Sequence, residues 1–103
     1  MFTHKVIMLR TSQETLFENE SPEFTTILAQ LKDLRIQSSG FISDEESISD
    51  DKLTYTKWNN WQSQTDYENY CTVNKELATQ YIQMRVLYNN KNNIKMTIED
   101  STT

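Results

Sequence analysis

The sequence predicts an α+β fold in which an antiparallel sheet carries two helices on one of its faces. Four short segments have the apolar or alternating patterns of strands, and they cover residues 5–10, 41–48, 53–61 and 94–98. Two longer segments, residues 21–37 and 65–88, begin with helix start signals and continue with apolar residues at helical spacing. The resulting order is strand, helix, strand, strand, helix, strand, which is typical of two βαβ halves that share one sheet.

Residues 5–10 (KVIMLR) form an apolar run with charged ends, which predicts a buried strand because the run is too short for a helix. The next ten residues, 11–20, are polar and acidic. Their only apolar pair is Leu16 and Phe17, so we expect a loop that these two side chains fasten to the domain.

The clearest helix start is Ser21-Pro22-Glu23. A serine oxygen accepts an unpaired backbone N–H at the N-cap, proline suits the first helical position, and an acidic first turn complements the helix dipole. One apolar face follows, formed by Phe24, Ile27, Leu28, Leu31 and Leu34. We expect this helix to end near residues 35–37, because the chain's only glycine, Gly40, comes soon after.

Residues 41–48 and 53–61 predict an antiparallel hairpin, since two strand-like runs are separated by a short polar stretch. Five carboxylates occur between positions 44 and 51, and we expect them at the tip of the hairpin: Asp44, Glu45, Glu46, Asp50 and Asp51. A solvated tip is the simplest interpretation of such a cluster. A docking patch for a basic partner is a second interpretation, and a calcium site is a third, although the EF-hand spacing is missing.

Thr65 and Glu68 have capping-box spacing, so the second helix is predicted to begin at Thr65 and to run to about Tyr88. Its inward stripe comprises Tyr67, Tyr70, Cys71, Leu77, Ala78, Tyr81, Met84 and Tyr88. An alternative remains open, because residues 81–88 are rich in strand formers and can pair instead with residues 94–98. Residues 99–103 are expected to form a polar tail.

These elements predict a single α+β domain over residues 1–103, a ferredoxin-like βαββαβ sandwich. Hydrophobic residues make up only 36% of the chain, so the core must be small and rich in aromatic side chains. We expect the core to contain Phe24, Phe41, Tyr55, Trp58 and Trp61. Because a core of this size is marginal for a monomer, we predict a homo-oligomer, either a dimer or a higher assembly.

Composition argues against several classes of partner. The net charge is −5 and the ten Lys and Arg residues are scattered, whereas nucleic-acid-binding proteins carry a basic stripe. No apolar run approaches the roughly 18–20 residues of a membrane span. We therefore predict neither a nucleic acid nor a membrane as partner. With one cysteine there is no internal disulfide, so we expect a cytoplasmic protein, or a virion protein if the source is viral.

The sequence contains no recognisable catalytic constellation. A single glycine rules out the glycine-rich loops that cradle phosphates. Cys71 would have only His4 as a base and lies on the predicted buried stripe, so we interpret it as a packed thiol. One histidine and one cysteine cannot build a tetrahedral zinc site unless carboxylates or a second subunit contribute. We predict no catalytic residue, no metal and no cofactor.

The aromatic residues indicate either an interface or a pocket, because tryptophan is enriched at interface hot spots. The predicted interface consists of Trp58, Trp61, Tyr67, Tyr70, Tyr81, Arg85 and Tyr88. Within it, Arg85 is expected to form an ion pair with another subunit or with the sheet, and a ligand carboxylate is its alternative partner. The alternative to the interface is a ligand pocket lined by Tyr55, Trp58, Asn59 and Trp61.

The passage LTYTKWNNWQSQTDY, residues 53–67, places a strand that ends in tryptophan before a helix whose first turn carries an acidic and an aromatic residue. Together with the order of elements over nearly the whole chain, it resembles the dimeric α+β barrel superfamily, which includes antibiotic-biosynthesis monooxygenases. The resemblance implies a homodimer whose two sheets face each other, often around a pocket. Asn59, Asn60 and Trp61 are residue types that suit a cofactor-independent oxygenase. The haem-degrading branch uses a histidine on the second helix, and this chain has none between Thr65 and Tyr88.

Three functions are consistent with these observations. The leading hypothesis is a non-catalytic structural or assembly protein that associates with itself and docks to a larger complex. A phage virion is one such complex, because the Asn-, Ser- and Thr-rich, glycine-poor composition also resembles small accessory and virion proteins of tailed bacteriophages. The alternative is a small cofactor-independent monooxygenase-like enzyme or a ligand-binding dimer. A third hypothesis is an acidic decoy of a basic partner.

Overall fold

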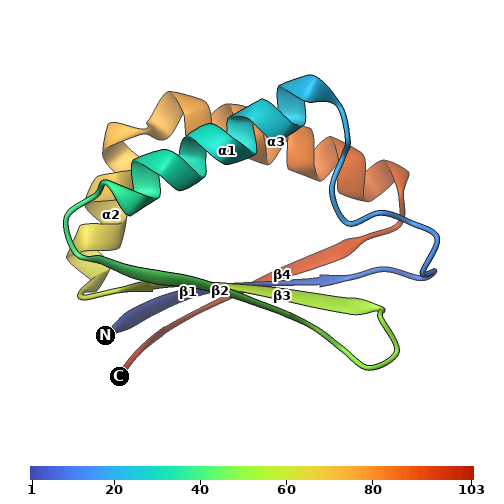
Figure 1. The fold of residues 1–103 in the computed structure, drawn as a ribbon, viewed down its shortest axis with the longest axis horizontal. Helices are drawn as coiled ribbons and strands as arrows, with labels where there is room; N and C mark the ends of the chain where they lie inside the picture. The colour runs from blue at the N-terminus through green and yellow to red at the C-terminus, as the bar shows by residue number, and fades with distance from the viewer.

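The computed structural model describes residues 1–103, in which four strands form one antiparallel sheet of order β2-β3-β1-β4. The strands are β1 (Phe2–Leu9), β2 (Phe41–Ile48), β3 (Thr54–Trp61) and β4 (Lys95–Thr102). The helices are α1 (Pro22–Ile36), α2 (Gln64–Val73) and α3 (Lys75–Lys91). All of them lie on one face of the sheet and leave the other face uncovered (Figure 1). This arrangement confirms the predicted ferredoxin-like α+β fold.

Strand β1 is the centre of the sheet and pairs along its full length with β3 and with β4. Both β1 and β4 are longer than their apolar patterns predict, since β1 begins at Phe2 and β4 continues to Thr102. The polar tail expected at residues 99–103 is therefore mostly a strand. Its backbone groups pair with those of β1, and this pairing does not depend on the polarity of the side chains.

Helix α1 begins as predicted. Ser21 has extended backbone angles, its side chain accepts a hydrogen bond from the backbone N–H of Phe24, and Pro22 follows at the first helical position. The chain turns into β2 at Gly40, whose φ of +81° is a conformation that favours glycine. A side chain at this position would also collide with Asp66, because a Cβ atom would lie 2.2 Å from its Oδ2 atom.

The second helical segment differs from its prediction at both the start and the middle. Its N-cap is Ser63 rather than Thr65, and the Ser63 hydroxyl accepts a hydrogen bond from the Asp66 backbone N–H. The segment breaks at Asn74, which separates α2 from α3 and whose side chain donates to the Tyr70 carbonyl oxygen. Residues 81–88 lie inside α3, so the helical interpretation of this stretch holds and the strand alternative does not.

The buried core consists of two small clusters under the helices. One comprises Phe2, Leu31, Trp61 and Tyr70, and the other comprises Met8, Phe17 and Ile94. Of the apolar pair in the loop at residues 11–20, only the Phe17 side chain is buried, because Leu16 is 49% exposed. Trp58 does not join either cluster, because it lies on the sheet face opposite to the helices. Trp58 was expected in the core because of its size, but the alternation of side chains along β3 directs it to the uncovered face of the sheet.

The five carboxylates of residues 44–51 do not gather at the tip of the hairpin. Strand β2 continues to Ile48, so Asp44, Glu45 and Glu46 lie within the strand. Only Asp50 and Asp51 occupy the turn. Asp51 accepts hydrogen bonds there from the Ser49 hydroxyl and the Leu53 backbone N–H, which lower the pKa of its carboxyl group. The acidic segment is therefore divided between a strand and a turn.

Candidate functional site

A cavity of about 490 Å³ lies between helices α1 and α3 and the sheet face that they cover. Its apolar wall includes Val6, Leu28, Leu31 and Tyr81. Its polar wall includes His4, Arg35, Asp44, Glu46, Lys57 and Asn59. The sheet contributes most of the polar groups, because side chains two residues apart on a strand share a face.

The strand register arranges the polar groups in two rows across the sheet. In the first row His4, Asn59 and Asp44 lie on adjacent strands, because His4 is opposite Asn59 and Asn59 is opposite Asp44. In the second row Val6 is opposite Lys57, which in turn is opposite Glu46. These groups come from segments far apart in the sequence, and only the sheet brings them together.

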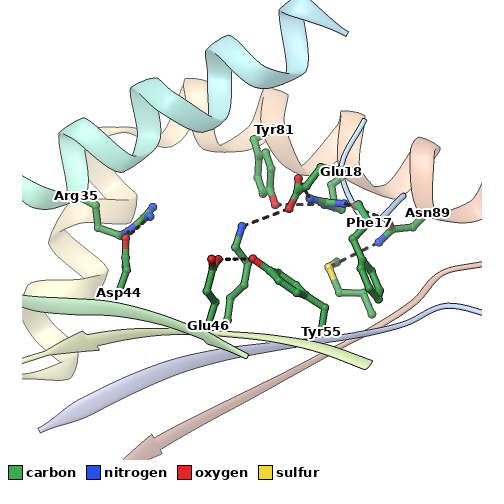
Figure 2. Close-up of polar contacts among 11 residues, drawn as sticks. Phe17, Glu18, Arg35, Asp44, Glu46, Tyr55, Tyr81 and Asn89 are labelled. Atoms are coloured by element: carbon green, nitrogen blue, oxygen red, sulfur yellow. Dashed lines mark hydrogen bonds and ion pairs between the residues drawn. The ribbon is translucent and has the colours of Figure 1, made fainter. Parts of the chain in front are cut away.

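Asp44 is held from two sides. The Arg35 guanidinium at the end of α1 donates to both of its carboxylate oxygens, with Nη2 to Oδ2 at 2.7 Å, and Asn59 Nδ2 donates to Oδ1 at 2.6 Å. Burial lowers the pKa of Arg35, but its hydrogen bonds and charge attraction to Asp44 outweigh this and raise the pKa. Figure 2 shows this pair reaching from α1 to the sheet. No hydrogen bond engages the amide oxygen of Asn59, so it is a free acceptor.

In the second row Glu46 accepts a hydrogen bond from the phenol of Tyr55 (Figure 2). Burial raises the pKa of the Tyr55 phenol, and the adjacent Glu46 carboxylate raises it further, so the phenol stays protonated. Lys57 Nζ lies 3.5 Å from the carboxylate of Glu18. The charged groups of this row are therefore satisfied within the protein.

His4 is the only imidazole of the chain and its side chain is 16% exposed. Its Nδ1 atom lies 2.7 Å from Oδ1 of Asp100 on β4. The ring of Tyr67 from α2 stacks on the imidazole, with ring centroids 4.8 Å apart. Because one ring nitrogen is engaged by Asp100, Nε2 is the nitrogen that is left without a protein partner.

Arg85 on α3 ties the far end of the cavity to the loop at residues 11–20. It is completely buried and donates to the Phe17 carbonyl oxygen at 2.5 Å and to the Glu18 carboxylate at 2.6 Å. Its Nε donates to the hydroxyl of Tyr81, which lines the cavity. Burial lowers the pKa of Arg85, but the charge interactions with Tyr81 and Glu18 raise it overall. The ion pair that the sequence predicts for Arg85 thus forms with a loop.

The structure divides the residues of the predicted ligand pocket. Tyr55, Asn59 and Trp61 share the helix-covered face, but Trp61 is completely buried in the core. Trp58 lies on the opposite face, where Lys5 approaches its ring at 5.9 Å. The position of Trp58 on the other face could have been predicted from the sequence. Trp58 is an odd number of residues from the other three, and side chains alternate between the two faces along a strand.

Most residues of the predicted interface also lie beneath the helices. Trp58 is the member on the uncovered sheet face, while the others pack inward: Trp61, Tyr67, Tyr70, Tyr81, Arg85 and Tyr88. Cys71 packs against the same core, and burial raises the pKa of its thiol. The predicted docking patch is divided as well, since Asp44 and Glu46 turn to the cavity while Glu45 accepts a hydrogen bond from Asn60 on the uncovered side.

Three residues of this site were not predicted from the sequence, namely Arg35, Lys57 and Asp100, and His4 was expected only as a distant base for Cys71. Asp100 and His4 are 96 positions apart, and no local pattern connects them. For Arg35 and Lys57 the useful signal was a charge at an inward position of a helix or strand, which only becomes clear once the register is known.

The fold defines the class, a ferredoxin-like α+β protein, and solved structures that share this fold include a putative antibiotic biosynthesis monooxygenase from Deinococcus radiodurans. No family model matches the sequence, and no curated protein matches it. Among solved structures, SnoaB, a cofactor-independent oxygenase from Streptomyces nogalater, matches with a TM-score of 0.57 and 11% identity over 99% of this chain and 91% of that one.

Two further structures cover the chain in the same way. The monooxygenase from the gene ActVA-Orf6 of Streptomyces coelicolor, in complex with nanaomycin D, has a TM-score of 0.56 and 13% identity over 99% of this chain and 88% of that one. A dimeric ferredoxin-like protein from an uncultured marine organism has a TM-score of 0.59 and 15% identity over 100% of this chain and 94% of that one. Identities of this size show a shared fold, and the dimeric neighbour supports self-association.

These neighbours correct the leading functional hypothesis. The expectation of a non-catalytic structural or assembly protein is contradicted, because structures that match nearly the whole chain are oxygenases and monooxygenases. They favour the enzyme-like alternative. The resemblance to phage virion proteins finds no support, and neither does the expected larger assembly. None of the three helices combines the length and apolarity needed to cross a membrane.

Proposed function

We propose that this chain is a small cofactor-independent monooxygenase-like enzyme that binds an organic substrate in the cavity between the helices and the sheet. The observation that carries the proposal is the cavity itself, which has about 490 Å³, an apolar wall and several convergent polar groups. Small-molecule sites have volumes of roughly 300–1,000 Å³ and the same combination of apolar walls and few polar groups.

The chemistry of such a reaction restricts the substrate. Without a cofactor, the electrons that reduce one oxygen atom of O2 to water must come from the substrate. Oxidation of a methylene group to a carbonyl group balances this requirement, since one methylene group and one molecule of O2 give one ketone and one molecule of water. The methylene hydrogens must be acidic, so that a base of the protein can remove one of them. A methylene group between aromatic rings, conjugated with a carbonyl group, meets these conditions.

The charges of the cavity favour a substrate without net charge. Arg35 is paired with Asp44, and Lys57 is paired with Glu18. A charged group bound against either pair would have to break it and leave a charge without a partner, which is costly. Lys32 also lines the cavity without an ion pair, but its side chain is exposed and not part of the interior. The free amide oxygen of Asn59 and the Tyr81 hydroxyl remain to orient polar substituents.

We further propose that the enzyme is a homodimer that forms through the sheet face opposite to the helices. This face carries Trp58 together with Ile7 and Leu9, and Leu9 is 45% exposed. Large aromatic and aliphatic side chains on an uncovered face favour association with a second apolar face. The dimeric neighbour supports self-association.

Anthrone is a suitable probe, because its methylene lies between two aromatic rings opposite a carbonyl group. We expect the protein to bind anthrone and to convert it with one equivalent of O2 to anthraquinone faster than buffer does. Calorimetric titration measures binding, an oxygen electrode measures the consumption of O2, and mass spectrometry identifies the anthraquinone product. Binding without turnover would support the ligand-binding dimer instead of the enzyme.

Filling the cavity tests its location. Leu28→Trp places a large side chain in the apolar wall and is expected to weaken anthrone binding at least tenfold. Ile82→Trp is the matched control, because Ile82 is 43% exposed and does not line this cavity. Equal binding by both variants, or no binding of anthrone by the unmodified protein, would contradict the proposed site.

A further inference from the structure

We propose that His4 is the proton acceptor of this cavity and that Asp100 is its positioning residue, an inference that rests on the function proposed above. The imidazole lines the cavity, and Nδ1 lies 2.7 Å from the Asp100 carboxylate. A carboxylate beside Nδ1 of a histidine fixes the tautomer and the orientation of the ring, and it stabilises the imidazolium that forms when the other nitrogen takes a proton.

The sheet holds this pair in a defined geometry. Strands β1 and β4 run antiparallel, and His4 lies directly opposite Asp100 in their register. Their side chains therefore leave the sheet on the same face and next to each other. Neither residue depends on a flexible loop, because the ladder continues past them on both sides, from Phe2 opposite Thr102 to Leu9 opposite Lys95.

Helix α2 fixes the plane of the imidazole. The Tyr67 ring stacks on it with 4.8 Å between centroids and 23° between planes. Burial raises the pKa of the Tyr67 phenol, and the nearby Cys71 thiol raises it further, so this phenol stays neutral and does not compete for a proton. The imidazole is thus held by a carboxylate at one edge and by an aromatic ring on one face.

The other candidate bases of the cavity are occupied. Asp44 accepts hydrogen bonds from Arg35 and Asn59, Glu46 accepts one from Tyr55, and Glu45 at the cavity edge accepts one from Asn60. An ionised Asp100 can only accept, so the neutral imidazole carries its hydrogen on Nδ1 and keeps a lone pair on Nε2. Nε2 is therefore the basic atom of the cavity that no protein group engages.

The step that follows is a proton transfer. Nε2 forms an N–H bond as a C–H bond of the substrate methylene breaks, and the electron pair stays on the substrate carbon. Asp100 stabilises the resulting imidazolium. The carbanion then gives electrons to O2, the imidazolium returns its proton to the peroxide, and loss of water leaves the carbonyl product. The substrate class is therefore a carbon acid rather than an unactivated alkane.

The tautomer of His4 can be measured without any substrate, because it is the only histidine of the chain. In protein labelled with 15N-histidine, we expect the neutral ring to carry its hydrogen on Nδ1. Asp100→Ala should convert this to a mixture with a large Nε2–H share. Glu99→Gln is the control, because Glu99 is the neighbouring residue of β4 and pairs with Lys5 at 3.7 Å. An Nε2–H tautomer in the unmodified protein, or no effect of Asp100→Ala, would overturn the assignment.

Proton abstraction can be separated from oxygenation. Under anaerobic conditions in D2O, the protein should catalyse deuterium exchange into the methylene group of anthrone. His4→Gln should reduce this exchange at least 100-fold while anthrone binding changes less than threefold. Asp100→Asn should reduce it at least tenfold, and Asp100→Glu should restore part of the loss.

The two proposals then fail in different ways. Exchange that depends on His4, but without oxygen consumption, would support this inference and contradict the monooxygenase function. Oxygenation of anthrone at the same rate by the unmodified protein and by His4→Gln would overturn the inference and leave the function standing. Absence of anthrone binding would contradict both.

Discussion

The guanidinium of Arg85 lies 2.6 Å from the carboxylate of Glu18, which joins helix α3 to a loop 67 positions earlier in the chain. Arg85 has no exposed surface and also donates to the Phe17 carbonyl oxygen. In a core with few fully buried apolar residues, this polar junction holds the loop against the helices. It also places the Tyr81 hydroxyl at the cavity wall.

We expect Arg85→Met to lower the free energy of unfolding by about 2–4 kcal/mol, because the buried Phe17 carbonyl oxygen loses its donor and Glu18 keeps only Lys57, at 3.5 Å, as its partner. Glu18→Gln should cost less, about 1–2 kcal/mol, because its amide oxygen can still accept a hydrogen bond from Arg85 although the buried guanidinium loses its carboxylate partner. Urea denaturation of both variants measures the difference. Equal losses of unfolding free energy in the two variants would contradict the expectation that the buried Arg85 contributes more to stability than the partly exposed Glu18.

Gly40→Ala tests the turn between α1 and β2. The backbone there has a φ of +81°, and the new Cβ would lie 2.2 Å from Oδ2 of Asp66. We expect a loss of about 1–3 kcal/mol, from the unfavourable backbone conformation and from the displacement of Asp66. Ser39→Ala is the matched control, because Ser39 is exposed, and it should stay within about 0.5 kcal/mol of the unmodified protein. A neutral Gly40→Ala would mean that the turn adopts another conformation in solution.

Stability is expected to fall at alkaline pH. Burial raises the pKa values of Tyr55, Tyr67 and Tyr70 above the ordinary value of 10.0. Above about pH 10 the unfolded chain loses these protons while the folded protein retains them, so each such tyrosine lowers the free energy of unfolding by about 1.4 kcal/mol per pH unit. Below about pH 10 these groups cause no pH dependence. Urea denaturation between pH 8 and 11 measures the slope.

Tyr67→Phe provides the control for this pH dependence. It removes one of these three phenols and should make the alkaline slope shallower, even if it changes the stability at pH 8 through loss of the contact between the phenol and Cys71. An unchanged slope, or a stability of the unmodified protein that rises above pH 10, would contradict the raised pKa values.

Trp58→Glu tests the proposed dimer. Trp58 lies on the sheet face that the helices leave uncovered, so a charge there should prevent two sheets from facing each other without disturbing the core. We expect sedimentation to shift from the mass of two chains to the mass of one at micromolar concentration. Val73→Glu is the control, because Val73 is 82% exposed at the end of α2, and its mass should not change. An unmodified protein that sediments as a monomer would contradict the dimer.

Local signals predicted most of the elements. The Ser21 cap and the end of α1 before Gly40 depend on residues within a few positions, and the structure confirms both. The start of the second helical segment was predicted at Thr65, but Ser63 caps it because the chain leaves β3 in an extended conformation at that residue. Two possible caps two residues apart are not distinguishable by spacing alone.

The candidate site was predicted only in part. Tyr55 and Asn59 were chosen as pocket residues, and both face the helix-covered side of the sheet. Trp58 was placed with them although the alternation of the strand separates it. The basic groups Arg35 and Lys57 were not chosen, because in the sequence Arg35 looks like the solvated end of a helix and Lys57 like a solvated position in the middle of a strand.

By itself the sequence determined how strands and helical segments alternate and where the first helix lies, because caps and apolar periodicity act over a few residues; it did not indicate the break at Asn74 that divides the second segment into α2 and α3. Only the tertiary structure decided that His4 meets Asp100 and that Arg85 meets Glu18, across 96 and 67 positions. The physical reason is that a strand pattern specifies which side chains share a face but not which strand lies beside it. Here the strand order β2-β3-β1-β4 determines which strands are neighbours, and therefore which side chains meet in the cavity.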